Sequence, residues 1–312
     1  MTAIIKRFVA VIPVMLIVAA VVFIIMHVAP GDPAANILGD DATPEAIARL
    51  REEMGLNKPL AQQTVEWFAR VLRGDLGQSI FLHISVNKAI YQHLQATLML
   101  TVLSMFLSIT IGILAGVIAA VQHNRFLDQL VMLLTSFGVA VPNFWLGLML
   151  MLIFALTLQL LPPTGYVPLK EGVLPHLRYL VLPSLALALG QAAAIARMTR
   201  ANMLEVLQND YIRTARSKGL VERVVIFKHA LKNALIPTIT VIGLTFANVM
   251  GGAVVTEQIF NIPGIGRLLI TSVARRDYPV IEGIVLYIAA AYVIINLLVD
   301  IIYKYLDPRI KL

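Results

Sequence analysis

The stretch that decides the fold covers residues 94–121 and reads LQATLMLTVLSMFLSITIGILAGVIAAV. It contains no Asp, Glu, Lys or Arg. About 20 apolar residues in an α-helix, each rising about 1.5 Å, cross a hydrocarbon core about 30 Å thick. We therefore predict that residues 94–121 form a membrane-spanning helix.

Five further apolar runs extend this prediction, and they cover residues 8–28, 129–161, 179–196, 234–255 and 283–299. The first is too long for the apolar part of a signal peptide and no Ala-x-Ala site follows it, which favours a retained anchor helix. Pro142 interrupts the second, where we expect a kink because proline cannot donate the intrahelical hydrogen bond. The sequence thus predicts an all-α, polytopic membrane helical bundle with six transmembrane helices.

The composition agrees with a membrane protein and excludes several kinds of site. Hydrophobic residues make up 59% of the chain and the mean hydropathy is +0.82, whereas apolar residues make up about 45–50% of a soluble domain. The chain has no cysteine, which excludes disulfide bonds, thiolate metal sites and thiol nucleophiles. It has no phosphate-binding loop, no His-Glu-x-x-His and no Gly-x-Ser-x-Gly, and its histidines show no metal-ligand spacing. We therefore expect no catalytic residue, no metal site and no cofactor in this chain.

The distribution of Lys and Arg predicts the orientation of the six helices. If both termini are cytoplasmic, more than half of the basic residues fall in short cytoplasmic segments, in agreement with the positive-inside rule. The net charge of +7 then reflects membrane topology, and it requires no nucleic-acid partner. We expect a multi-pass protein of a bacterial inner (plasma) membrane.

The spans divide the chain into an anchor helix at 1–28, an extracytoplasmic helical segment at 29–93, a core of five helices at 94–305 and a cytoplasmic tail at 306–312.

Two short helices are predicted in the extracytoplasmic segment. Thr43-Pro44-Glu45 predicts an N-cap, a first-turn proline and an acidic first turn, and opens a helix that ends at Gly55. A second helix is expected over 60–71, with an apolar face made by Val65, Phe68 and Leu72. A structured loop that covers the bundle is favoured over direct contact with a substrate.

The basic cytoplasmic segment at 197–233 carries a second helical pattern. Its apolar residues recur at spacings of three and four and predict one helix, which ends at Gly219. They are Leu204, Leu207, Tyr211 and Ala215. A second amphipathic helix follows and leads into the fifth span. The residues alone favour a helix pair at the membrane interface, with docking of a soluble partner as the alternative.

The same segment carries a resemblance to a known family. The order Tyr211-Ile-Arg-Thr-Ala-Arg-Ser-Lys-Gly219, followed by Lys228-His-Ala-Leu-Lys-Asn-Ala-Leu-Ile-Pro237, closely resembles the permease subunits of ABC importers for peptides and nickel. Further fragments resemble this family in the same order along nearly the whole chain. They lie at 29–33, 73–79, 141–147, 251–257, 263–267, 276–280, 296–300 and 307–311. The resemblance implies the permease fold of a type I ABC importer.

In that family the segment is the EAA-type loop, which inserts a short coupling helix into a groove of the ATPase subunit. The broader pattern has Glu-Ala-Ala, three residues and Gly, and this chain has Arg213-Thr214-Ala215 before Gly219. The resemblance therefore implies a docking role without a specific salt bridge at the first position. The residues expected to couple to the ATPase are Tyr211, Arg213, Thr214, Ala215, Arg216, Lys218 and Gly219.

The resemblance also implies an outer gate along the translocation pathway. The expected residues are Asn143, Gly251, Gly252, Glu257, Pro263 and Gly264. From the residues alone, Asn143 either places an amide in the bundle interior or belongs to an ordinary proline kink. A carboxylate such as Glu257 near the lipid boundary is expected to face water or a cavity, either as part of a gate or as an interfacial anchor.

The resemblance implies a transporter that works by alternating access with partners. These are a second homologous permease subunit, two ATPase subunits that bind ATP and Mg, an extracytoplasmic solute-binding protein and membrane lipid. The implied substrates are short peptides of the dipeptide and oligopeptide class, with nickel chelates, glutathione or opine-like conjugates as alternatives. A secondary, ion-coupled transporter is the other alternative, and it is disfavoured because the spans are almost free of charged residues.

Overall fold

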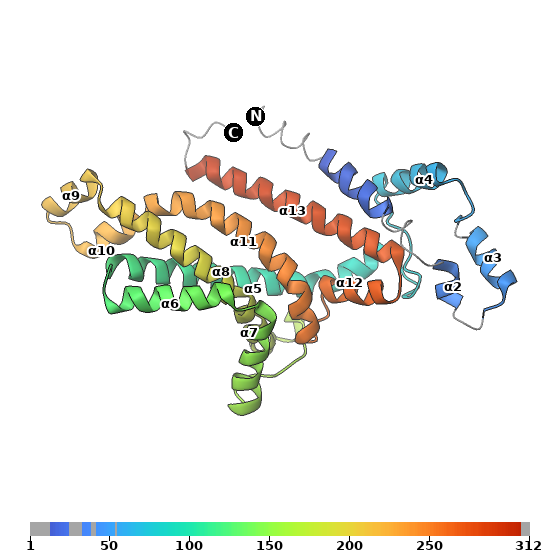
Figure 1. Ribbon diagram of the computed structural model, residues 1–312, viewed down its shortest axis with the longest axis horizontal. Coiled ribbons are helices and arrows are strands. Elements are labelled where there is room, and N and C mark those ends of the chain that lie inside the picture. The colour runs from blue at the N-terminus through green and yellow to red at the C-terminus, as the bar shows by residue number, and fades with distance from the viewer. Residues whose placement is uncertain (1–12, 25–32, 39–41, 54, 307–312) are drawn as a thin grey trace. The chain divides into compact units, whose positions relative to one another are not determined.

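The computed structural model describes residues 13–24, 33–38, 42–53 and 55–306. Apart from an isolated bridge between Gln78 and Ser85, the described residues contain no β-structure, which confirms the all-α fold. The elements of Figure 1 are α2 (Pro33–Leu38), α3 (Pro44–Glu53), α4 (Leu60–Leu72), α5 (Val86–Val121), α6 (Phe126–Ala140), α7 (Asn143–Leu150), the π-helix η1 (Met151–Thr157), the 3₁₀ helix η2 (Leu169–Glu171), α8 (Val173–Leu207), α9 (Asp210–Ser217), α10 (Glu222–Val224), the π-helix η3 (Val225–Ala230), α11 (Leu231–Ile259), α12 (Ile265–Ala274) and α13 (Tyr278–Leu306).

Four helical stretches among the described residues are long and apolar enough to cross a membrane. They are Val86–Val121, Val173–Leu207, Glu222–Ile259 and Tyr278–Leu298. They contain the runs predicted at 94–121, 179–196 and 234–255 and most of the run at 283–299. A shorter apolar helix covers Pro13–Ile24, within the predicted first span. The rest of that span, most of the motif at 29–33 and the motif at 307–311 lie outside the described residues.

The predicted third span is broken, and the expectation of one kinked helix is wrong. Its two halves, α6 and α7 with η1, meet at 108°, and Figure 1 shows α7 turning away from α6. Val141 (φ −88°, ψ 128°) and Pro142 (φ −62°, ψ 138°) both have extended backbones. Proline disfavours the helical conformation of the residue before it, so the helix ends instead of bending. The pair forms a broken span or a re-entrant loop.

The chain divides into two compact units. The first contains residues 1–95 and 264–294, and the second contains 96–263 and 295–312. In the first unit, one apolar core joins the start of α5 to α12 and α13 through Ile90, Ile265 and Ile284. The Asp277 carboxylate, just before α13, accepts hydrogen bonds from the backbone N–H groups of Ile80 and Phe81, both at 3.2 Å.

Both predicted extracytoplasmic helices are present in this first unit. The Ala46 N–H donates to Thr43 Oγ1 at 3.3 Å, which confirms the predicted N-cap of α3. The predicted apolar face of α4 is right for Phe68, which packs against a buried cluster, and wrong for Val65 and Leu72, which are exposed. Trp67, which was not predicted, is buried. The indole Nε1 of Trp67 donates to Glu282 of α13 at 2.7 Å, so a long-range polar contact selects which face is buried.

In the second unit, α5 and α8 pack closely through two glycines. A Cβ atom on Gly112 would lie 2.8 Å from the Ala192 carbonyl oxygen, and one on Gly116 would lie 2.6 Å from the Ala196 carbonyl oxygen. Small residues four apart on a membrane helix allow this approach of two backbones. Any larger side chain would force α5 and α8 apart.

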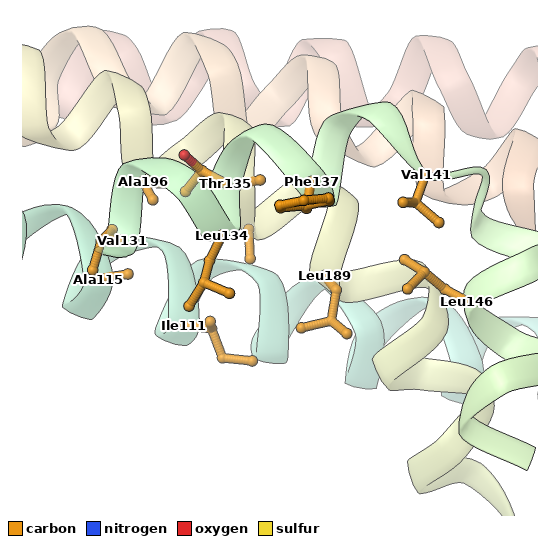
Figure 2. A pocket seen from close by; sticks show the side chains of 13 residues that line it. Ile111, Ala115, Val131, Leu134, Thr135, Phe137, Val141, Leu146, Leu189 and Ala196 are labelled. Carbon is orange, nitrogen blue, oxygen red and sulfur yellow. The ribbon is translucent and has the colours of Figure 1, made fainter. Parts of the chain in front are cut away.

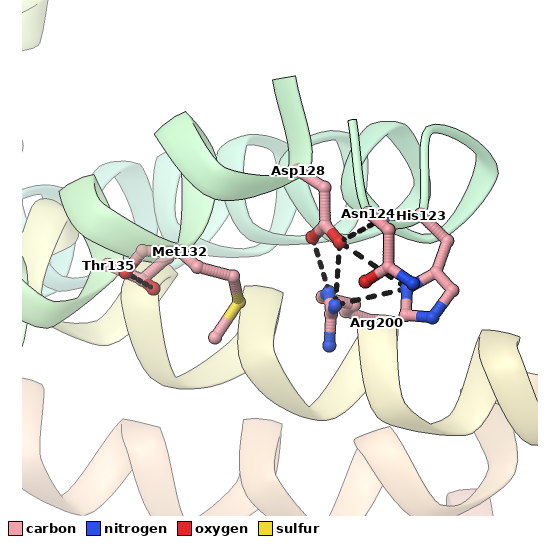
Figure 3. A network of polar contacts seen from close by, with 6 residues as sticks. All are labelled: His123, Asn124, Asp128, Met132, Thr135 and Arg200. Atoms are coloured by element: carbon pink, nitrogen blue, oxygen red, sulfur yellow. Dashed lines mark hydrogen bonds and ion pairs between the residues drawn. The ribbon is translucent and has the colours of Figure 1, made fainter. Parts of the chain in front are cut away.

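A hollow and an ion pair lie between α6 and α8 in this unit. The hollow has a volume of about 340 Å³, and its lining is apolar except for Thr135. Figure 2 shows the side chains that line it. The hydroxyl of Thr135 donates to the Met132 carbonyl at 2.9 Å, so it offers a ligand in this hollow an acceptor but no free proton. Figure 3 shows Arg200 of α8 donating to both Asp128 carboxylate oxygens, at 2.5 and 2.7 Å. This partly buried ion pair fixes the start of α6 against α8.

Candidate functional site

The segment between the fourth and fifth spans is built from more helices than predicted. The single helix expected up to Gly219 is wrong, because α8 ends at Leu207 and α9 begins at Asp210. Asn209 has an extended backbone (φ −68°, ψ 146°) and is the N-cap of α9. Asn and Asp favour helix starts over helix interiors, so the break falls at this pair. Figure 1 shows α9 and α10 beyond the ends of α8 and α11.

The inner face of α9 is a packed apolar contact. Ile212 is completely buried and Ala215 is 8% exposed. They share an apolar cluster with residues of α5, α8, η3 and α11. Its other buried members are Val117, Ala120, Met203, Val225, Ile226, Ala230 and Ala234. Because α9 is seated on four elements at once, displacement of α9 must disturb all of them.

Polar contacts fix α9 at both ends. Asn233 Nδ2 donates to the Tyr211 hydroxyl at 2.8 Å, which ties α9 to α11. Arg216 donates to both carboxylate oxygens of Glu222, at 3.2 and 2.7 Å, and ties α9 to α10. The Glu222 carboxylate raises the pKa of the Arg216 guanidinium further above its usual value. Asn233 was not among the predicted site residues, although it lies inside the second motif at 228–237.

The outer face of α9 is open. Arg213 has a side chain that is 73% exposed and makes only a loose contact of 3.6 Å with Asp210. Thr214 and Lys218 are exposed too. Gly219 has φ +75° and no atom within 4 Å of the position of a Cβ, so it provides the left-handed residue that ends α9. Of the seven predicted residues, only Ala215 faces inward.

The residues predicted for the outer gate are brought together only in part. A Cβ on Gly252 would lie 3.3 Å from Asn143 Nδ2, and one on Gly190 would lie 3.1 Å from Asn143 Oδ1. The Asn143 amide therefore lies between α8 and α11, as one of the two interpretations expected. Gly251 faces open space. Pro263 is exposed and Gly264 is buried at the start of α12, and the boundary between the two units falls between them.

Glu257 differs from its prediction. It was expected to face water or a cavity, but it is completely buried and accepts a hydrogen bond from Thr97 Oγ1 at 2.6 Å. A carboxyl in an apolar bundle needs hydrogen-bonding partners to offset its desolvation. The interpretation of Glu257 as an exposed interfacial anchor is therefore wrong. Thr97, 160 residues away in sequence, was not predicted as its partner.

Family models match both parts of this chain. The model described as "Binding-protein-dependent transport system inner membrane component" matches residues 112–312, and the N-terminal model of the same transport systems matches residues 1–101. The chain belongs to this family. It is a permease of a binding-protein-dependent ABC importer, and the resemblance noted in the sequence is confirmed. As a member, this permease is a multi-pass protein of the inner membrane.

Curated relatives match this permease over almost its whole length. A probable peptide ABC transporter permease of Sinorhizobium fredii is 45% identical over 99% of this chain and 98% of its own. A dipeptide transport system permease of Alkalihalophilus pseudofirmus is 42% identical, with 98% of each chain covered. A glutathione transport system permease of Salmonella typhimurium is 42% identical over 99% of this chain and 98% of its own.

Solved structures show that the fold is that of ABC importer permeases. The MetNI methionine ABC transporter in an inward-facing conformation matches with a TM-score of 0.58 at 18% identity, over 70% of this permease and 96% of that chain. A chain of an amino acid ABC transporter solved with histidines matches with a TM-score of 0.50 at 15% identity, over 72% of this permease and 95% of that chain.

Proposed function

We propose that this permease carries short peptides, of the dipeptide and oligopeptide class, across the inner membrane in an ATP-driven importer. The observation that carries the proposal is full-length identity of 42 to 46% to permeases named for peptides, dipeptides and glutathione. Each of these names describes a peptide or a peptide-like molecule. None of the relatives described above is named for nickel chelates or opine-like conjugates.

The proposed assembly contains partner subunits that supply ATP hydrolysis, the rest of the pathway and substrate delivery. Two ATPase subunits bind ATP and Mg and hydrolyse the nucleotide, a second homologous permease completes the pathway, and an extracytoplasmic binding protein delivers the substrate. Both termini and α9 lie on the cytoplasmic side, in agreement with the distribution of Lys and Arg. The phosphate-binding loop that ATP hydrolysis by this route requires is missing from this sequence.

In this proposal α9 is the coupling helix. Its open outer face, with Arg213, Thr214 and Lys218, contacts the ATPase, while Ile212 and Ala215 hold it on the apolar cluster beneath. The Tyr211 and Arg216 contacts keep α9 from rotating on that cluster. When the ATPase displaces α9, the displacement is transmitted to α8 and α11, because closely packed helices move as rigid bodies and deform little.

We further propose that Asn143, Gly252 and Glu257 belong to the mobile part of the translocation pathway. The amide of Asn143 lies beside Gly252 at the broken span, and Glu257 is on the same helix α11 about one and a half turns further on. Backbone at a break and a buried carboxyl are both costly in lipid and are retained where a membrane protein binds or moves.

The test is uptake and ATP hydrolysis by the reconstituted importer. The double variant Arg213→Glu with Lys218→Glu reverses two charges on the open face of α9 and touches no packed side chain. We expect normal insertion and assembly, but a loss of transport-coupled ATP hydrolysis of at least tenfold. The matched control, Arg73→Glu with Lys170→Glu, changes two exposed cations outside this segment and is expected to transport normally.

Two results would reject the proposal. Uptake that persists without any ATPase subunit would favour an ion-coupled transporter. Purification of this permease from its native membrane with no nucleotide-binding subunit, identified by mass spectrometry, would reject the assembly itself.

A further inference from the structure

The helical stretch that follows α9 carries three cationic side chains with no partner. Arg223 of α10, Lys228 of η3 and Lys232 of α11 are all exposed. Within the described part of the chain, none of the three side chains makes a hydrogen bond or an ion pair. The nearest acidic residue in this stretch, Glu222, is already bonded to Arg216. Their charges are therefore available to a partner outside the chain.

The π-helix places the three cations on one face. In η3 the backbone hydrogen bonds join residues five apart instead of four, and Arg223, Lys228 and Lys232 are separated by five and then four. The buried residues Val225, Ala230 and Ala234 show the same spacing, two positions later. Two positions correspond to a rotation of about 200°, so the cations lie on the side of the helix opposite to the apolar cluster.

Apolar side chains accompany the cations on this outward face. Phe227 is 51% exposed and Val224 is 38% exposed. An exposed aromatic ring beside cations is typical of the boundary between lipid headgroups and acyl chains.

The positions of the cations along the helix also agree with the boundary between headgroups and acyl chains. The apolar run at 234–255 is long enough to cross the hydrocarbon core. Lys232 and Lys228 precede it by about 3 and 9 Å along the helix, which is the depth of the headgroups. Long cationic side chains extend from such positions to the phosphates. The sequence from 223 to 256 contains no Asp or Glu, and the carboxylate of the adjacent Glu222 is paired with Arg216.

We propose that Arg223, Lys228 and Lys232 form a binding site for anionic phospholipid headgroups, with Phe227 between the acyl chains. The chemistry is phosphate bound by two or three cations, held at the membrane by an aromatic ring. A soluble polyanion would satisfy the cations but would leave Phe227 and Val224 in water. The site lies next to α9 and does not depend on which substrate is transported.

The test measures lipid retention by the assembled importer. The importer is reconstituted in nanodiscs of phosphatidylcholine mixed with phosphatidylglycerol and is then extracted. The lipids that it retains are identified by native mass spectrometry. The variant Arg223→Gln, Lys228→Gln, Lys232→Gln removes the site. Each such cation strengthens attraction to anionic lipid about fivefold, so we expect the preference for phosphatidylglycerol to fall by roughly 100-fold, and by less in high salt.

A control with the same loss of charge is Arg73→Gln, Lys88→Gln, Lys170→Gln, which changes three exposed cations elsewhere. It is expected to retain phosphatidylglycerol like the unchanged importer. Equal retention by the site variant, or equal loss in the control, would overturn the proposal. The proposal would also be overturned if a photo-crosslinker at position 227 reacted with an ATPase subunit and not with lipid. Lipid retention is read without transport, so its failure is distinguishable from failure of the proposed function.

Discussion

The partly buried ion pair between Asp128 and Arg200 allows a sharp test of the second unit. Asp128 is 3% exposed and accepts hydrogen bonds from Arg200 Nε and NH2, and from the Asn124 N–H at 2.9 Å. His123 Nδ1 lies 3.4 Å from the same carboxylate. The substitution Asp128→Asn keeps the shape of the side chain and removes its charge, which leaves Arg200 without its counter-ion.

The size of the effect follows from burial. Removal of one partner of a fully buried pair costs about 3–5 kcal/mol, because the other charge stays desolvated. The Arg200 side chain is 21% exposed and recovers part of its hydration, so we expect a loss of about 2–3 kcal/mol. For a chain of this length that lowers the unfolding midpoint by about 4 °C. Replacing both residues, Asp128→Leu with Arg200→Met, is expected to recover most of this loss.

The measurement is thermal unfolding of the purified permease in detergent, run as a double-mutant cycle. The exposed pair of Lys58 and Glu66, 2.8 Å apart, provides the control, since an exposed pair contributes about 0–1 kcal/mol. The reasoning is refuted if Asp128→Asn destabilises no more than Lys58→Gln does. It is also refuted if the losses from Asp128→Leu alone and Arg200→Met alone simply add up to the loss of the double variant.

Three further substitutions test other contacts by the same measurement. Gly116→Leu places a side chain against a carbonyl oxygen of α8 and is expected to abolish the folded fraction, whereas Gly251→Leu, at an open position, is expected to fold; equal folding of the two would contradict the packing. Trp67→Phe removes the hydrogen bond to Glu282 and is expected to cost about 1–3 kcal/mol, so an unchanged midpoint would show that the bond contributes nothing. Gly219→Ala meets no atom but must keep φ +75°, and a loss of about 1 kcal/mol is expected from backbone strain alone; a loss several times larger would show that other contacts are involved.

Features set by local chemistry could be predicted from the sequence. Runs without charged residues gave the membrane helices, because the bilayer imposes a length and a composition on each span. Thr43 and Gly55 marked the start and the end of one helix by their own backbone preferences, and Gly55 has φ +70° in the structure.

Features set by distant contacts could not be predicted. Glu257 is buried because Thr97 reaches it from another helix, and nothing near position 257 in the sequence indicates that partner. Which face of α4 is buried depends in the same way on a distant residue, because Trp67 donates to Glu282 of α13. The break before Asn143 was predicted as a kink because a proline alone does not show whether neighbouring helices will support a continuous span.

The glycine contacts between α5 and α8 restrict how this permease can move. A shear movement needs side chains that can slip past one another, but here a carbonyl oxygen of α8 occupies the space that a Cβ of α5 would fill. We therefore expect the parts of α5 and α8 around these glycines to move as one rigid body. Their positions along each other should not change during the transport cycle. Movement must then occur at looser joints, such as the bend between α6 and α7.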